Sequence, residues 1–223
     1  NAQDFARKVI TNLPPDPNLR SQFAGDLDDL HLSGEALAAW KRVIEVSPTS
    51  ERAHYRMARL LLEAGDASSA RQAAEAGLAA APKAANLYLV HADALERLGL
   101  VHDARRTLEQ GVAAVTDLGL LSRLAATEDT YGNPAAEAYA RLVEVPAISP
   151  ADRVKAMERG FAVSMRDGDL AHADAFASAL DAAGRSEFRG LLGVNTSREA
   201  TTTLPGGMEA LAFAAHMQPG TSP

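Results

Sequence analysis

Residues 51–84 read ERAHYRMARLLLEAGDASSARQAAEAGLAAAPKA. Apolar residues recur every three or four positions on both sides of a short turn, which predicts two amphipathic helices. Gly65 stands where the first helix ends, as a left-handed C-cap requires. Pro82 ends the second helix, because proline cannot continue one. The stretch therefore predicts a helix, a tight turn and a second helix.

The same pattern recurs along the chain with a period of 34 residues. The recurring residues are Ala24, Ala58, Ala92 and Ala126 of the first helices; Ala2, Ala36, Ala70, Ala104 and Ala138 of the second helices; the turn residues His31, Gly65, Gly99 and Asn133; and Pro14, Pro48, Pro82 and Pro150. Thr116 occupies the one slot without a proline, and a final unit follows one residue late, with Gly168 and Ala173. Because each unit buries its core only against its neighbours, we expect an all-α solenoid.

This pattern resembles the tetratricopeptide repeat. The small residue, turn glycine, second-helix alanine and terminal proline typical of that family are Ala58, Gly65, Ala70 and Pro82. His54 and Leu61 stand where the family usually has aromatic residues. The resemblance implies a right-handed α-solenoid of antiparallel helix pairs, with about five and a half repeats of 34 residues.

We expect the array to cover residues 1–184, followed by a tail. The expected segments are an orphan helix at 1–14; repeats at 17–50, 51–84, 85–118, 119–152 and 154–184; a capping helix at 185–194; and a linker or tail at 195–223 that contains a short amphipathic helix, MEALAFAAHM, at 208–217. The orphan helix either caps the array or indicates that the chain was cut from a longer one. The amphipathic helix either folds back on the array or occupies a groove, of its own molecule or of a neighbour.

Composition favours a helical scaffold. The 223 residues include 46 Ala and only 5% aromatic residues, which favours closely packed helices over a β-sandwich. A net charge of −7 argues against nucleic-acid binding, and no apolar run is long enough to insert in a membrane. The absence of cysteine excludes disulfides and leaves the compartment open between cytoplasm and bacterial periplasm. Frequent Ala and Arg with little Lys indicate a bacterial protein.

The sequence contains no motif of a catalytic site. Phosphate-binding, dinucleotide-binding, zinc-protease and serine-hydrolase patterns are absent, so we expect no enzyme activity, no cofactor and no metal. His54 and His91 fall on the packed side of first helices and are interpreted as buried structural residues. The acidic cluster at residues 26–35 lacks the spacing of a calcium loop and is interpreted as a solvated helix end.

The resemblance places the working surface in a concave groove lined by the first helices. The groove candidates that it implies are Arg52, Tyr55, Arg59, Asn86, Leu89, Asp93, Arg97, Arg123, Thr127, Tyr131, Lys155 and Arg166. Arginine and tyrosine are typical of binding hot spots. An arginine-rich face suits an acidic peptide, through charge-assisted hydrogen bonds. Alternatively, Arg59 and Arg97 neutralise Asp93 and Glu96 across adjacent helices.

The predicted function is a non-catalytic scaffold that binds a peptide or protein segment in this groove. One alternative is a targeting or regulatory arm of a larger enzyme whose catalytic domain lies outside this chain. The other is homo-oligomerisation through the end helices or the 208–217 segment.

Overall fold

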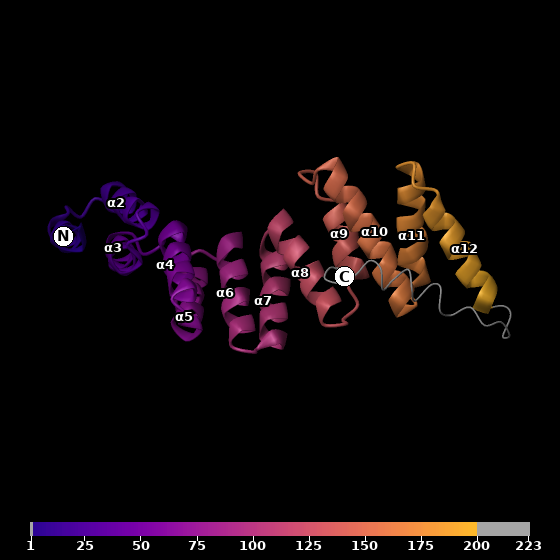
Figure 1. Cartoon of the computed structure of the whole chain (residues 1–223), viewed down its shortest axis with the longest axis horizontal. Coiled ribbons are helices and arrows are strands. Elements are labelled where there is room, and N and C mark those ends of the chain that lie inside the picture. Colours follow the sequence, from indigo (N-terminus) through magenta and orange to yellow (C-terminus); the bar gives the residue numbers. More distant parts are fainter. Residues whose placement is uncertain (1, 200–223) are drawn as a thin grey trace. The chain divides into compact units, whose positions relative to one another are not determined.

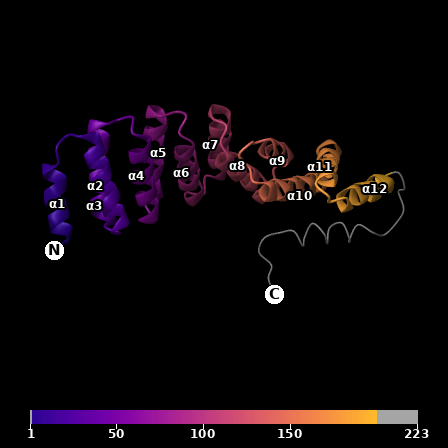
Figure 2. The same ribbon diagram turned by 90° about the horizontal axis from the view of Figure 1, so that it is seen from above.

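The computed structural model describes residues 2–199, with side chains from residue 3 to residue 193, and this part of the chain is entirely α-helical (Figures 1 and 2). Its helices are α1 (Ala2–Asn12), α2 (Pro17–Asp29), α3 (Ser33–Val46), α4 (Glu51–Glu63), α5 (Ala67–Ala80), α6 (Ala85–Arg97), α7 (Val101–Ala114), α8 (Leu118–Thr130), α9 (Ala136–Val143), α10 (Pro150–Asp167), α11 (Leu170–Ala182) and α12 (Glu187–Glu199). The all-α prediction is confirmed. The expected helix at 208–217 lies outside the described residues. Among the helices described, none has the length and apolar character needed to cross a membrane.

The chain divides into an N-terminal unit that ends at Arg123 and a C-terminal unit that begins at Leu124. In the N-terminal unit the first helices α2, α4 and α6 pack on the second helices α3, α5 and α7 of their own pairs. Helix α3 also packs on α4, α5 packs on α6, α4 contacts α6, and α1 packs on α3. In the C-terminal unit, α9 contacts α10 and α11, α10 packs on α11, and α11 packs on α12. Consecutive helix pairs stacked in this way are the expected solenoid architecture.

Local sequence sets where the helices of the N-terminal unit begin. Asp16, Ser50 and Asp66 cap α2, α4 and α5, because each side chain accepts a hydrogen bond from the backbone N–H three residues later. Pro17 follows Asp16 as the first residue of α2, where a proline removes no helical hydrogen bond.

The prolines between pairs are each held by a side chain of the following first helix. Arg20 Nε donates to the Pro14 carbonyl at 2.8 Å, His54 Nε2 bonds the Pro48 carbonyl at 2.9 Å, and Tyr88 Oη donates to the Pro82 carbonyl at 3.0 Å. The bonding residue lies six positions after the proline each time. Each loop is therefore fixed to the pair that follows it, a role that the sequence pattern did not reveal.

Glycines allow three helices to meet at one point. A Cβ atom at Gly77 on α5 would lie 2.7 Å from His54 Cβ on α4 and 2.9 Å from Leu87 Cδ1 on α6. A Cβ atom at Gly111 on α7 would lie 2.8 Å from Tyr88 Cγ on α6. Real Cβ contacts are longer than these, so only glycine fits where a second helix touches both its own first helix and the next one.

One residue is missing from the 34-residue spacing between α7 and α8. Loops 47–50 and 81–84 connect the earlier pairs, whereas loop 115–117 is one residue shorter. Asp117 caps α8 by accepting a hydrogen bond from Leu120 N at 2.9 Å. Helix α8 therefore starts one residue earlier than the repeat predicts.

This shift makes two predicted positions wrong. The turn residue with positive φ is Gly132 (70°), and not Asn133. The buried small residue is Ala125, which has 0% exposure, whereas Ala126 is exposed. The shorter loop contains Thr116, the slot without a proline, which was the visible sign of the irregularity.

Pro150 begins a helix and does not end one. Helix α9 already ends at Val143, and Pro150 is the first residue of α10. Ser149 caps α10 by accepting a hydrogen bond from Asp152 N at 3.1 Å. The last pair therefore begins four residues before the predicted boundary at 154, because a Ser-Pro step is a good helix start.

Helix α12 extends past the predicted capping segment. It packs on α11 and continues through residues 195–199, which the sequence analysis assigned to the tail. Those residues include neither glycine nor proline, so nothing in them ends a helix. The Phe188 ring of α12 meets the Phe161 ring of α10 edge to face, with centroids 5.2 Å apart.

Candidate functional site

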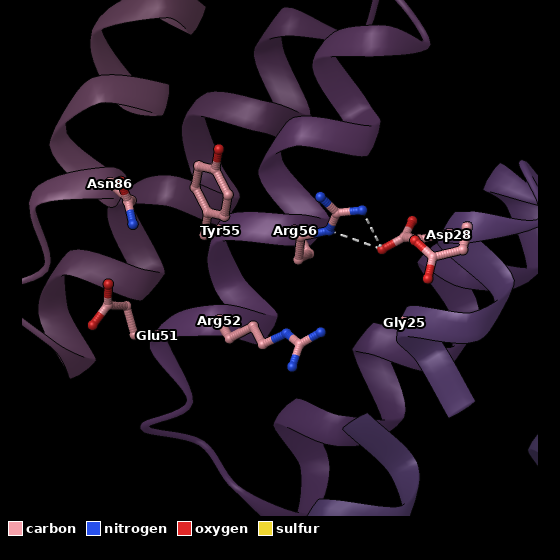
Figure 3. Close-up of a pocket in the computed structure, with 8 residues that line it drawn as sticks. Gly25, Asp28, Glu51, Arg52, Tyr55, Arg56 and Asn86 are labelled. Carbon is pink, nitrogen blue, oxygen red and sulfur yellow. Dashed lines mark hydrogen bonds and ion pairs between the residues drawn. The ribbon is translucent and has the colours of Figure 1, made fainter. Parts of the chain in front are cut away.

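A pocket of about 380 Å³ lies on the face that the first helices of the N-terminal unit form. Its lining residues are Gly25, Asp28 and Asp29 from α2; Glu51, Arg52, Tyr55 and Arg56 from α4; and Asn86 from α6 (Figure 3). Three consecutive helix pairs thus contribute to one site, because equivalent positions of successive first helices lie side by side.

Gly25 gives this pocket its depth. A Cβ atom at this position would lie 3.2 Å from Arg52 Nη2, and no other atom comes within 4 Å. Glycine inside a helix costs about 1 kcal/mol relative to alanine, so its position in the middle of α2 needs a reason. The structure provides one, since the missing side chain leaves room for the Arg52 guanidinium beside α2.

Asp28 forms the back wall through a buried ion pair. Its side chain is only 2% exposed, and Oδ2 accepts hydrogen bonds from Trp40 Nε1 at 2.7 Å and from Arg56 Nε at 2.8 Å. Arg56 Nη2 also lies 2.8 Å from the same oxygen (Figure 3). The other oxygen, Oδ1, is buried and has no hydrogen-bond partner. The carboxylate thus has all its donors on one side.

The acidic cluster at residues 26–35 is not the solvated helix end that the sequence analysis expected. Asp28 and Glu35 are buried, with 8% and 6% exposure, and Glu35 pairs with Arg7 at 3.1 Å. Asp28 follows Ala24 by one helical turn on the packed stripe of α2, which was the available sign that it faces inward. No group of three or more His, Cys, Asp or Glu side chains in the described part of the chain is placed to hold a metal ion.

Three of the predicted groove residues, Arg52, Tyr55 and Asn86, come together in the pocket. Arg52 lies over the Trp40 ring, with its guanidinium carbon 5.5 Å from the ring centroid. Leu89 is half-buried on α6, outside the lining.

The other predicted arginines of the N-terminal unit are occupied by the protein itself. Arg59 pairs with Glu63 at 3.2 Å, and this hydrogen bond raises the pKa of the guanidinium. Arg97 donates to the Leu62 carbonyl at 2.7 Å. Arg123 on α8 reaches back to α6 and contacts the carboxylates of Asp93 at 2.9 Å and Glu96 at 2.5 Å. Of the two alternatives for these charges, internal neutralisation is the one that the structure shows.

The remaining predicted residues belong to the C-terminal unit. Thr127 is buried, with 4% exposure, because the shift in α8 turns this position toward the core. Tyr131 is 48% exposed. Lys155 lies 3.2 Å from Asp152, and Arg166 lies 2.8 Å from Asp129 and 2.7 Å from Asp167. The hydrogen bond to Asp167 is the main cause of the raised pKa of Arg166.

Sequence reasoning missed Glu51 and Arg56, which line the pocket but do not occupy the helix positions that the resemblance assigns to the groove. Arg56 could have been inferred from Asp28, since a carboxylate on a packed stripe requires a cationic partner. Their sequence separation of 28 residues is close to one repeat, as expected for adjacent first helices.

Known proteins share this architecture. Residues 34–92 match the family model described as tetratricopeptide repeat. The structure of YrrB, described as a TPR protein with an unusual peptide-binding site, is 16% identical, with a TM-score of 0.55 over 86% of this chain and 97% of that one. PilW, a type IV pilus biogenesis factor, is 16% identical, with a TM-score of 0.54 over 81% and 84% of the two chains. PilF of Pseudomonas aeruginosa is 12% identical, with a TM-score of 0.53 over 97% and 100%. A comparison with curated protein sequences gave no match.

Proposed function

Because the chain is a tetratricopeptide-repeat protein, we propose that it is a non-catalytic scaffold that binds a segment of a partner protein on the first-helix face of its N-terminal unit. The observation that carries the proposal is the pocket of about 380 Å³, in which Arg52, Tyr55 and Asn86 meet. These three residues come from two successive helix pairs at positions where related repeats bind peptides.

The chemistry of the lining suits an extended segment. The Asn86 carboxamide both donates and accepts, so it can bond the N–H and C=O groups of a peptide backbone. Tyr55 and Arg52 offer the aromatic and guanidinium groups typical of binding hot spots. The volume holds one or two side chains, so the segment would insert a side chain here and lie along the first helices on either side. The peptide-binding site described for YrrB supports a peptide as the class of ligand.

A pair of glycine substitutions tests the proposal without unfolding the protein. In Gly25→Phe, the new side chain meets only the flexible end of Arg52 and fills the pocket. In the matched control Gly34→Phe, the side chain is added on α3, where nothing lies within 4 Å of the new Cβ. Peptides are selected from a displayed random library with the parent protein, and their affinities are then measured by fluorescence anisotropy.

We expect Gly25→Phe to weaken binding about tenfold or more, and Gly34→Phe to bind like the parent. Circular dichroism should show the same helix content in all three proteins. Equal affinity for the parent and Gly25→Phe would exclude this pocket as the binding site.

A further inference from the structure

The charges that line the pocket do not balance. The walls carry the carboxylates of Asp28, Asp29 and Glu51 and the guanidiniums of Arg52 and Arg56, which gives a net charge of −1. Arg56 is already paired with Asp28 at 2.8 Å. Two carboxylates and one guanidinium therefore remain to meet a ligand.

Neither remaining carboxylate is neutralised elsewhere. Asp29 and Glu51 are both exposed, and within residues 3–193 neither has an ion-pair partner. Arg52 stacks on Trp40 and approaches no carboxylate of the described side chains within ion-pair distance. Both acidic groups are thus available to a cation that enters the pocket.

Asp28 adds a second, independent sign of a cationic ligand. It is 8% exposed and lines the pocket, yet its Oδ1 atom lacks any hydrogen-bond partner. Buried carboxylates are normally satisfied on both oxygens, because an uncompensated buried charge is costly. The back wall of the pocket therefore carries a negative charge that only Trp40 and Arg56 compensate, both at Oδ2.

The carboxylates approach the pocket from different helices. Figure 3 shows Glu51 and Asn86 on one side and Gly25 and Asp28 on the other. A long side chain that enters between them would pass Glu51 of α4 and face the acidic end of α2.

From this arrangement we propose that the pocket binds a lysine or arginine side chain of the partner segment. Asp29 and Glu51 pair with the cationic head group, while Arg52 and Asn86 donate hydrogen bonds to carbonyl oxygens of the segment. An acidic segment would instead bring its carboxylates against three of the protein's own, with only Arg52 to receive them. The inference rests on the proposed function, because it assigns the chemistry of the segment bound at that site.

Peptide selection with two charge-matched variants tests the inference. Asp29→Asn with Glu51→Gln removes both pocket carboxylates. Asp174→Asn with Glu144→Gln makes the same change in net charge at exposed residues of the C-terminal unit. The parent and both double variants select peptides from one random library, and the Lys and Arg content of the selected peptides is compared.

We expect the parent and the Asp174/Glu144 variant to enrich Lys or Arg at one position, and the Asp29/Glu51 variant to lose that enrichment. For one selected basic peptide, affinity for the Asp29/Glu51 variant should fall about fivefold, as expected for two partly exposed ion pairs, and this difference should shrink with added salt.

Selected peptides that are acidic, or that show no charge preference, would overturn the basic ligand while leaving the peptide-binding function intact. Enrichment that survives in the Asp29/Glu51 variant would do the same. Failure of the parent to select any peptide over the Gly25→Phe variant would overturn the proposed function together with the inference.

Discussion

In the pair α4/α5 the second helix supplies the small residue at the crossing, whereas in the pair α10/α11 the first helix supplies it. Gly77 on α5 makes room for His54 on α4, and α6/α7 follows the same plan. In α10/α11, Gly160 lies on the first helix, and a Cβ atom there would be 2.4 Å from Cζ of Phe176 on the second helix. The comparison shows that a close crossing requires one small residue, and that either helix can provide it.

The two regions also differ in their loops. From α2 to α7 the turn residues with positive φ keep a spacing of 34 residues, at His31, Gly65 and Gly99. The next two, Gly132 and Gly168, are separated by 33 and 36 residues from the residues before them. Helix packing tolerates this change because the spacing is set in the connecting loops, which lie outside the crossings.

The largest effect should come from testing the register of α8. Replacing Ala125, which is fully buried, with Leu should destabilise the protein by about 2–3 kcal/mol through overpacking. Replacing the exposed Ala126 with Leu should change the free energy of unfolding by less than about 0.5 kcal/mol. Urea unfolding of the two variants measures both values. The reverse order would restore the uninterrupted 34-residue register.

The reversed crossing of α10/α11 can be tested with Gly160→Ala. The added methyl group would overlap the Phe176 ring, and we expect a net loss of about 1–2 kcal/mol after the gain in helix propensity is included. Combining it with Phe176→Leu, which removes the overlapping ring atoms, should give a smaller loss than the sum of the two single changes. Strictly additive losses in urea unfolding would mean that the two residues do not oppose each other.

The hydrogen bond to the proline carbonyl belongs to the regular region and should contribute less. Tyr88→Phe removes the bond to Pro82 while keeping the ring, so we expect a loss of about 1 kcal/mol. Tyr131→Phe is the matched control, since Tyr131 is exposed and no hydrogen bond of its hydroxyl is found among the described residues. Equal melting temperatures for the two variants would show that the proline bond is not stabilising.

The smallest effects should come from two histidines that respond to pH in opposite directions. Burial lowers the pKa of His91 on α6, so the stability that it contributes at neutral pH is lost as pH falls through the unfolded value of about 6.5. A hydrogen bond from His172 on α11 to Asp169 raises the pKa of that histidine. Its contribution is therefore present below about pH 6.5 and is lost as pH rises through the raised value.

Urea unfolding at about pH 5.5 and about pH 8 separates the two histidines. His91→Gln should reduce the loss of stability in acid, and His172→Gln should increase it, each by less than about 1 kcal/mol because solvent screens these groups. Shifts of the same sign in both variants would contradict the assignment.

The binding site was only partly predictable. Helix position alone identified Arg52, Tyr55 and Asn86, because equivalent positions of stacked first helices share a face. It could not show that Arg59 and Arg123 are occupied, because the availability of a guanidinium depends on which carboxylates lie within reach. For Arg123 those carboxylates are 27 and 30 residues earlier in the chain, on α6.

The sequence by itself determined the helix pairs, most of their caps and turns, and the stacking of one pair on the next. These features follow from local preferences, since a left-handed turn favours glycine, a helix start favours aspartate or serine, and a 34-residue repeat can bury its core only against its neighbours. Only the tertiary structure decided that α8 is one residue early, that Asp28 is buried behind Arg56, and that the pocket is left with two unpaired carboxylates. Those outcomes depend on distances between side chains of different helices, which a local pattern does not contain.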